Sequence, residues 1–197
     1  MRKLSDINEH LWSGIIHRSE TGEVRKEDME LFDRVKVFAD KHNIKREDFA
    51  IHNDGTVDFK TVVSIYKDDL IDGKFPFKFG KVAGNFYATD LDLRTLENSP
   101  REVGGNFVIY SNHHLHTLVG GPEIVHGNFA ANTAGLQNLD GSPKEVGGNF
   151  EVTYTNLKDI SGISPVIGGN VRLEHTTTKF TEDDVRKYSN VKGKITV

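Results

Sequence analysis

Apolar residues recur at fixed intervals between residues 82 and 171. Four segments share the pattern Val-x-Gly-Asn-Phe, and a fifth, slightly decayed copy reads Ile-Gly-Gly-Asn-Val. The glycine of Gly-Asn lies at 84, 105, 127, 148 and 169, so successive steps are 21, 22, 21 and 21 residues. A fixed period in this range is typical of a stacked repeat architecture. The five segments are 82–86, 103–107, 125–129, 146–150 and 167–171.

Further apolar columns follow each phenylalanine. Leu93 and Leu96 lie seven and ten residues after Phe86, and one inserted residue moves the next pair to Leu115 and Leu118. A proline then precedes the next repeat. Because no single coil can bury these columns alone, we expect them to stack into one core. The pattern predicts a mainly β fold, a parallel β-solenoid of about six coils of 21–22 residues, with a helical N-terminal cap and a short C-terminal cap.

An asparagine stands at the same place in all five repeats. We expect these residues to form an internal ladder, in which each side-chain amide pairs with turn backbone or with the asparagine of the next coil. Glycine before the asparagine would allow a sharp corner. The predicted ladder residues are Asn85, Asn106, Asn128, Asn149 and Asn170.

The chain divides into three parts. Residues 1–26 are an arm with apolar residues at roughly helical spacing, either a capping segment folded onto the first coils or a docking peptide. Residues 27–50 are a helical cap, with one helix from Glu27 to about Asn43. Residues 51–197 are the solenoid, with a C-terminal cap from about 180.

Local signals mark both ends of the solenoid. The run Asn53-Asp54-Gly55 between two apolar segments predicts a β-hairpin, followed by an irregular first coil over 56–81. Near the end, Thr181 and Asp184 form a capping box that predicts a short helix, and 191–197 resembles a sixth strand.

Composition restricts the function. The formal net charge of −4 argues against a nucleic-acid partner, because no strong positive field is available. No cysteine is present, which excludes disulfides, thiol nucleophiles and zinc–thiolate sites. The N-terminal residues lack the apolar core of a signal peptide, and no run is long enough to span a membrane. We therefore expect a soluble, cytosolic protein in a bacterial or infected-cell setting.

The motif Val-Gly-Gly-Asn-Phe, followed by Leu-x-x-Leu and proline, resembles the leucine-rich-repeat-like proteins of many large tailed bacteriophages and some of their hosts. The resemblance covers 82–171 firmly and 51–197 loosely, and the leader around Trp12 and Arg25 is similar to one found in phage proteins. It implies a right-handed solenoid that binds other macromolecules, and it carries no catalytic residue. Gly-Gly-Asn-Phe replaces the Leu-x-x-Leu of ordinary leucine-rich repeats, so the resemblance does not define the shape of the cross-section of the coil.

Two clusters of side chains are candidate metal sites. Histidines gather at 113, 114, 116, 126 and 175, and acidic residues at 68, 69, 72, 90 and 92. Neither cluster shows the recurring partner pattern that zinc or calcium binding requires. No catalytic motif and no phosphate-binding loop occurs. The sequence therefore predicts no enzyme, no metal and no cofactor.

Residues that vary between coils point to binding. The positions one, three and four after each phenylalanine are predicted to face outward, and they form a band with aromatic and polar groups suited to protein recognition. The candidate binding residues are Tyr87, Tyr110, Tyr154 and Arg172 in this band, and Trp12, Arg18 and Arg25 in the arm.

We expect a non-enzymatic, phage-encoded protein-interaction module with a host or virion protein as partner. The alternatives are a structural virion component anchored by its arm and an inhibitor of a host defence enzyme; the oligomeric state stays open.

Overall fold

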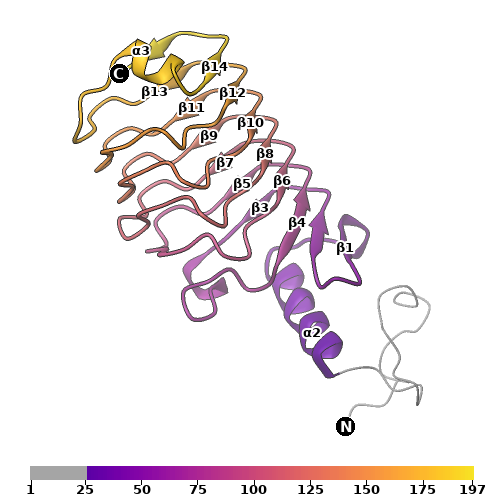
Figure 1. Cartoon of the computed structure of the whole chain (residues 1–197). Helices are drawn as coiled ribbons and strands as arrows, with labels where there is room; N and C mark the ends of the chain where they lie inside the picture. Colours follow the sequence, from indigo (N-terminus) through magenta and orange to yellow (C-terminus); the bar gives the residue numbers. More distant parts are fainter. Residues whose placement is uncertain (1–25) are drawn as a thin grey trace.

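The protein is a β-solenoid whose turns stack along one axis, as the computed structural model shows for residues 26–197 (Figure 1). Two sheets run along the stack, and every strand pair in them is parallel except the first hairpin. The predicted fold class is confirmed. One sheet contains β1 (Phe49–Ile51), β2 (Val57–Phe59), β4 (Phe79–Val82), β6 (Glu102–Val103), β8 (Ile124–Val125), β10 (Glu145–Val146), β12 (Val166–Ile167) and β14 (Asn190–Val191).

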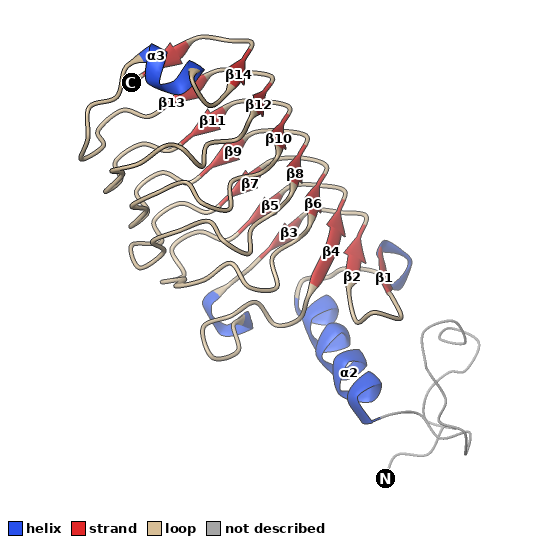
Figure 2. Cartoon of the chain, in the orientation of Figure 1, coloured by secondary structure: helices blue, strands red, loops and turns tan. Residues whose placement is uncertain are grey.

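The second sheet lies across the core from the first (Figure 2). It contains β3 (Val63–Ser64), β5 (Phe86–Tyr87), β7 (Phe107–Val108), β9 (Phe129–Ala130), β11 (Phe150–Glu151), β13 (Val171–Arg172) and β15 (Ile195–Thr196). The helical elements are α2 (Lys26–Lys41), α3 (Glu182–Arg186) and two 3-10 turns, Arg46–Asp48 and Lys67–Asp69.

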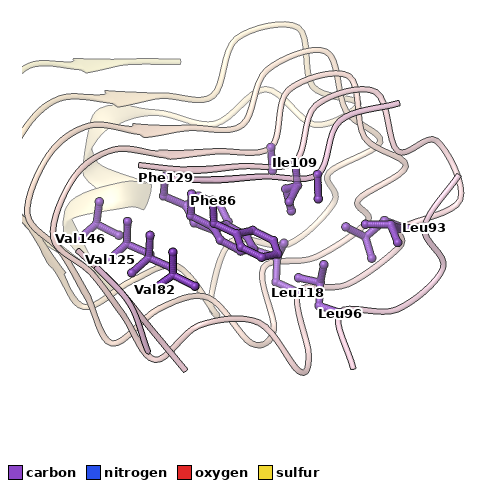
Figure 3. Close-up of a cluster of buried hydrophobic side chains, with 14 of the residues drawn as sticks. Val82, Phe86, Leu93, Leu96, Ile109, Leu118, Val125, Phe129 and Val146 are labelled. Atoms are coloured by element: carbon purple, nitrogen blue, oxygen red, sulfur yellow. The ribbon is translucent and has the colours of Figure 1, made fainter. Parts of the chain in front are cut away.

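The core consists of side-chain columns that run along the stack (Figure 3). Phe86 pairs with Phe107, Phe107 with Phe129 and Phe129 with Phe150 in the parallel ladder. Their rings are stacked, with centroids 5.5, 5.7 and 5.0 Å apart and interplanar angles of 9, 16 and 12°. All four rings are fully buried, and Phe107 and Phe129 each lie between two other phenylalanines.

The repeated asparagines form a hydrogen-bonded ladder at the corner between the two sheets. Each side-chain Oδ1 accepts the backbone N–H at the equivalent position of the next turn, at 2.8 to 2.9 Å. The amides pair with backbone and not with each other. The ladder starts at Asn85 and ends at Lys194, which stands in the asparagine position of the last turn.

The glycine before each asparagine is required by space. A Cβ at Gly105 or Gly148 would overlap Oδ1 of Asn85 or Asn128, the ladder residue of the preceding turn. The glycines lie at the bend between the two strands of each turn, as expected, but none of those in the Gly-Asn pairs has a positive φ, so space and not a left-handed backbone requires them. Gly and Asn are thus two halves of one contact between turns.

The inserted residue of the 22-residue repeat is accommodated by a buried asparagine. Asn112 is fully buried, and its Oδ1 accepts the N–H groups of Leu91 and Leu93 at 3.2 and 3.1 Å. Its Nδ2 donates to the carbonyls of Ala88 and Ile109 at 2.9 and 3.0 Å. The side chain thereby satisfies backbone groups of the preceding turn as well as one of its own turn.

The N-terminal end matches the predicted helix and hairpin. Helix α2 ends at Lys41, and Asn43 has φ 53°, as expected for a residue that ends a helix. The hairpin of β1 and β2 turns at Asn53-Asp54-Gly55, where Gly55 has φ +78°. β2 then begins the first turn, and Val63 takes the phenylalanine position beside Phe86.

A buried aspartate fixes α2 to the first turn. The Asp69 side chain is 3% exposed, and its carboxylate contacts Lys41 Nζ at 2.6 Å and His42 Nε2 at 3.0 Å. It also accepts the N–H of Tyr66 at 2.7 Å. Lys41 has a second, exposed partner in Asp68 at 2.7 Å. Hydrogen bonds that Lys41 donates to Asp68 and Asp69 raise the pKa of Lys41, so its charge is fixed at the end of the helix.

The C-terminal end contains one more turn than the sequence pattern showed. Thr181 and Asp184 form the predicted capping box of α3. The stretch 190–196 is two strands, β14 and β15, with Gly193 between them, and not a single sixth strand. The described residues therefore supply seven strands to the second sheet, so the stack has about seven turns instead of six.

The Gly–Asn contact predicts coupling between two substitutions in adjacent turns. We expect Gly148→Ala to destabilise the fold by about 1–3 kcal/mol, since the new Cβ overlaps Asn128. Asn128→Ala removes one hydrogen bond and costs about 1 kcal/mol. In the double variant the total loss of stability should be smaller than the sum of the two single losses, because the Asn128 oxygen that the new Cβ overlaps most closely is absent. Urea unfolding measures the three free energies.

The control for this cycle pairs Gly148→Ala with Asn106→Ala. Asn106 lies over Gly127 and not over Gly148, so these two effects should add. Equal additivity in both cycles would contradict the contact.

The burial of Asp69 predicts that its substitution destabilises the fold far more than substitution of the adjacent, exposed Asp68. Asp69→Ala leaves Lys41, His42 and a backbone N–H without their acceptor, and we expect a loss of about 3–5 kcal/mol in the free energy of unfolding. Asp68→Ala, which removes only the exposed partner of the same lysine, should change it little. Amide hydrogen exchange in α2 should accelerate in the first variant alone; equal exchange in both would show that Asp69 does not hold the helix.

Candidate interaction surface

The outward side chains of the first four strands of the second sheet form one uncharged surface. Side chains alternate along a strand, so the residue after each inward phenylalanine faces out, and so does the residue two further on. We call these residues the tyrosine strip: Ser64, Tyr66, Tyr87, Thr89, Val108, Tyr110, Ala130 and Asn132. No member of the strip is charged, and Tyr66 and Tyr110 are 54% and 37% exposed.

Polar contacts fix the tyrosine side chains of the strip. The Tyr87 hydroxyl accepts a hydrogen bond from Nδ2 of Asn85, the first ladder residue, at 2.9 Å. Partial burial raises the pKa of Tyr110, and the negative charge of Glu151 raises it further, while a hydrogen bond with Asn132 opposes the shift. Tyr110 therefore lies close to side chains from two following turns.

The first tyrosine of the strip is held by the helix. The His42 ring stacks on Tyr66 at 5.1 Å with an interplanar angle of 15°. Because His42 is itself bound to buried Asp69, the position of Tyr66 depends on the contact between α2 and the first turn. The sequence did not identify Tyr66, because Val63 replaces the phenylalanine from which the outward positions were counted.

The outer surface of the first sheet, which we call the charged sheet, differs in chemistry from the tyrosine strip. Its outward residues form ion pairs between turns: Lys81 Nζ with Glu102 at 2.7 Å, His126 Nε2 with Glu102 at 3.0 Å, and Lys144 Nζ with Glu123 at 2.6 Å. Hydrogen bonds from Lys81 and His126 lower the pKa of Glu102, and one from Lys144 lowers that of Glu123. This face presents charges already paired with each other.

Charged residues border the tyrosine strip on its C-terminal side. Arg172 donates to Glu174 at 2.8 Å, and this bond raises the pKa of Arg172. Tyr154 is 61% exposed and stacks on His175, with centroids 4.2 Å apart. Both residues have positive φ, 55° and 58°. Three polar residues, Asp90, Ser111 and Thr133, occupy the same position in earlier turns with similar φ.

The structure brings some of the predicted residues together and not others. Tyr87 and Tyr110 lie on the strip, whereas Tyr154 and Arg172 lie beyond its C-terminal end. Trp12, Arg18 and Arg25 fall outside the described residues.

The expected exposure is wrong at two positions of the predicted outward band. Ala130 and Thr153 are buried, although strand alternation places both on the outer side of the sheet. Ala130 has only a methyl group between the larger Val108 and Glu151 of the adjacent strands, and the N–H of Thr153 is bonded to Oδ1 of Asn132.

The histidine and aspartate clusters have other contacts. Asp68 and Asp69 bind Lys41, and Asp92 lies 3.3 Å from Lys67 and 3.8 Å from His114. Within residues 26–197, no group of three His, Cys, Asp or Glu is placed to hold a metal ion.

No protein-family model, no curated protein and no solved structure matches this chain. Among the helices of residues 26–197, none has the length and apolar character needed to cross a membrane.

The surroundings of Tyr110 predict how its phenol titrates. Glu151→Gln removes a negative charge that raises the pKa, so we expect this pKa to fall toward its ordinary value. NMR titration of ring-labelled tyrosine measures it. Glu145→Gln removes the same charge on the opposite sheet and should leave Tyr110 unchanged; an equal effect of both would place Glu151 away from the strip.

Proposed function

We propose that the protein is a non-enzymatic protein-interaction module that presents the tyrosine strip to a protein partner. One observation carries this proposal: the outward columns of β3, β5, β7 and β9 contain no charge, whereas the other sheet has ion pairs between successive turns. Depletion of charge and enrichment in tyrosine are typical of the centre of protein interfaces.

The composition of the strip supports a protein as partner. Tyr66, Tyr87 and Tyr110 offer large rings with a polar tip and few rotatable bonds, so they lose little entropy on binding. The ion pair of Arg172 and Glu174 beside the strip suits the polar rim of an interface. The repeat pattern, which resembles leucine-rich-repeat-like phage proteins, favours a partner in a bacterial host cell or in the virion.

Photocrosslinking from two opposite faces tests this proposal. A photoreactive amino acid replaces Val108 on the strip in one variant and Ile124 on the charged sheet in the other; both side chains are half-buried and lie on neighbouring turns. After irradiation in native cells, we expect one protein to be captured from position 108 and not from position 124. Tyr87→Ala with Tyr110→Ala should abolish that capture.

The identity of the captured protein separates the alternatives. A phage structural protein, with stoichiometric copies of this chain in purified particles, would favour a virion component. A host enzyme whose activity falls on binding would favour an inhibitor. Equal capture from both faces, or none, would contradict the proposal.

A further inference from the structure

A cleft lies where the β1–β2 hairpin meets the charged sheet, on the other side of the molecule from the tyrosine strip. Its volume is about 680 Å³, within the range of roughly 300–1,000 Å³ found for small-ligand sites. Residues 51–58 of the hairpin form one wall, and residues from β4 and β6 form the other. The charged residues that line it are His52, Asp54, Asp58, Lys78, Lys81, Arg101 and Glu102.

The acidic side chains of the cleft already have partners. Asp58 accepts the N–H of Lys81 at 2.6 Å and contacts Nε2 of His52 at 2.9 Å. Asp54 accepts the N–H and hydroxyl of Thr56 at 3.0 and 2.7 Å, inside its own turn. Glu102 is bound by Lys81. No carboxylate in the cleft is therefore free of a donor.

Two cations in the cleft lack such a close partner. No carboxylate of residues 26–197 lies within ion-pair distance of Lys78, whose charge acts on Asp54 only at longer range. Arg101 is 79% exposed and reaches Glu123 at 3.5 Å, but Glu123 is already held by Lys144 at 2.6 Å. Lys78 thus has no carboxylate partner among the described residues and Arg101 has a distant one, so both charge-assisted donors are available to a ligand in the cleft.

The backbone around these residues is built irregularly. The register between β2 and β4 shifts opposite Asp58, which is a β-bulge, and bulges are frequent beside functional sites. Gly80 lies in this bulge, where a Cβ would overlap Oδ1 of Asp58. The bulge brings the Lys81 N–H to Asp58, and Asp58 in turn orients His52 at the cleft wall. No regular turn of the solenoid needs these contacts.

We propose that this cleft binds an oxyanion, a carboxylate or phosphate group, through Lys78 and Arg101, with His52 as a further hydrogen-bonding group. The group belongs either to a free small molecule or to an acidic peptide side chain. This site is independent of the tyrosine strip, since it uses the other sheet.

NMR titration of ¹⁵N-labelled protein tests the site at constant ionic strength set with chloride. The probes are inorganic phosphate, glutarate and a tetraglutamate peptide. We expect saturable shifts confined to residues 51–58, 78–81 and 101–102. Lys78→Ala and Arg101→Ala should each weaken binding about tenfold, because each removes a charge-assisted contact. Saturation by phosphate or glutarate alone identifies a free anion as ligand, and saturation by the peptide alone identifies an acidic segment.

Lys192→Ala is the matched control. Lys192 is an exposed lysine beside β14, at the far end of the same sheet, and its loss should change the dissociation constant less than about twofold. Equal weakening by Lys192→Ala and Lys78→Ala, shifts spread over all basic residues, or the absence of saturation with every probe would overturn the proposal. Since Lys78, Arg101 and Lys192 are all exposed, these variants test binding without disturbing the core.

Discussion

The stack depends on one contact that each turn makes with the next: the amide oxygen of an asparagine placed over a glycine. The oxygen accepts a backbone N–H of the following turn, and it fits only because the glycine beneath it has no Cβ. A slip that moved the next asparagine into the glycine position would bring its side chain against the amide and break the hydrogen bond. The contact therefore fixes the register of successive turns. With the register fixed, each phenylalanine falls directly on the one before it, and the rings stack 5.0 to 5.7 Å apart. The stacking of side chains in the core therefore follows from the Asn–Gly contact at the corner between the two sheets.

Sequence reasoning identified what the turns share, because five copies of one pattern reveal each structural position. It was less accurate at the two ends, where the pattern changes. In the first turn Val63 takes the place of phenylalanine, and in the last turn Lys194 takes the place of asparagine. Helix α3 lies between the sixth and seventh turns, so the spacing to Gly193 no longer matched the period. The sequence also assigned the glycines to a corner, since a pattern shows that glycine is needed but not whether dihedral freedom or space requires it.

The candidate surface was predictable only in part, for a related reason. Period-two alternation places Tyr87 and Tyr110 on the outside, and the structure agrees. Exposure, however, depends on the size of neighbours in adjacent turns, which alternation does not contain. Ala130 is buried between Val108 and Glu151, while Tyr66 is exposed although its turn lacks the repeat motif. The cleft at the hairpin was not found at all. It depends on a β-bulge and on cations from two turns, and neither leaves a periodic signal.

Both proposed surfaces lie on the turns nearest α2, and the packing there explains why a binding surface would be placed at this end. A regular solenoid turn is held only by its two neighbours. The first turn has in addition a helix bound through a buried aspartate, and His42, which directly follows this helix, stacks on Tyr66. A ring that is fixed before binding loses less conformational entropy when a partner covers it. The hairpin wall of the cleft is likewise fixed in advance, by Asp58 and the bulge. The irregular end of the stack therefore adds rigid, chemically distinct groups, Tyr66 and the hairpin wall, that the repeating turns alone do not offer.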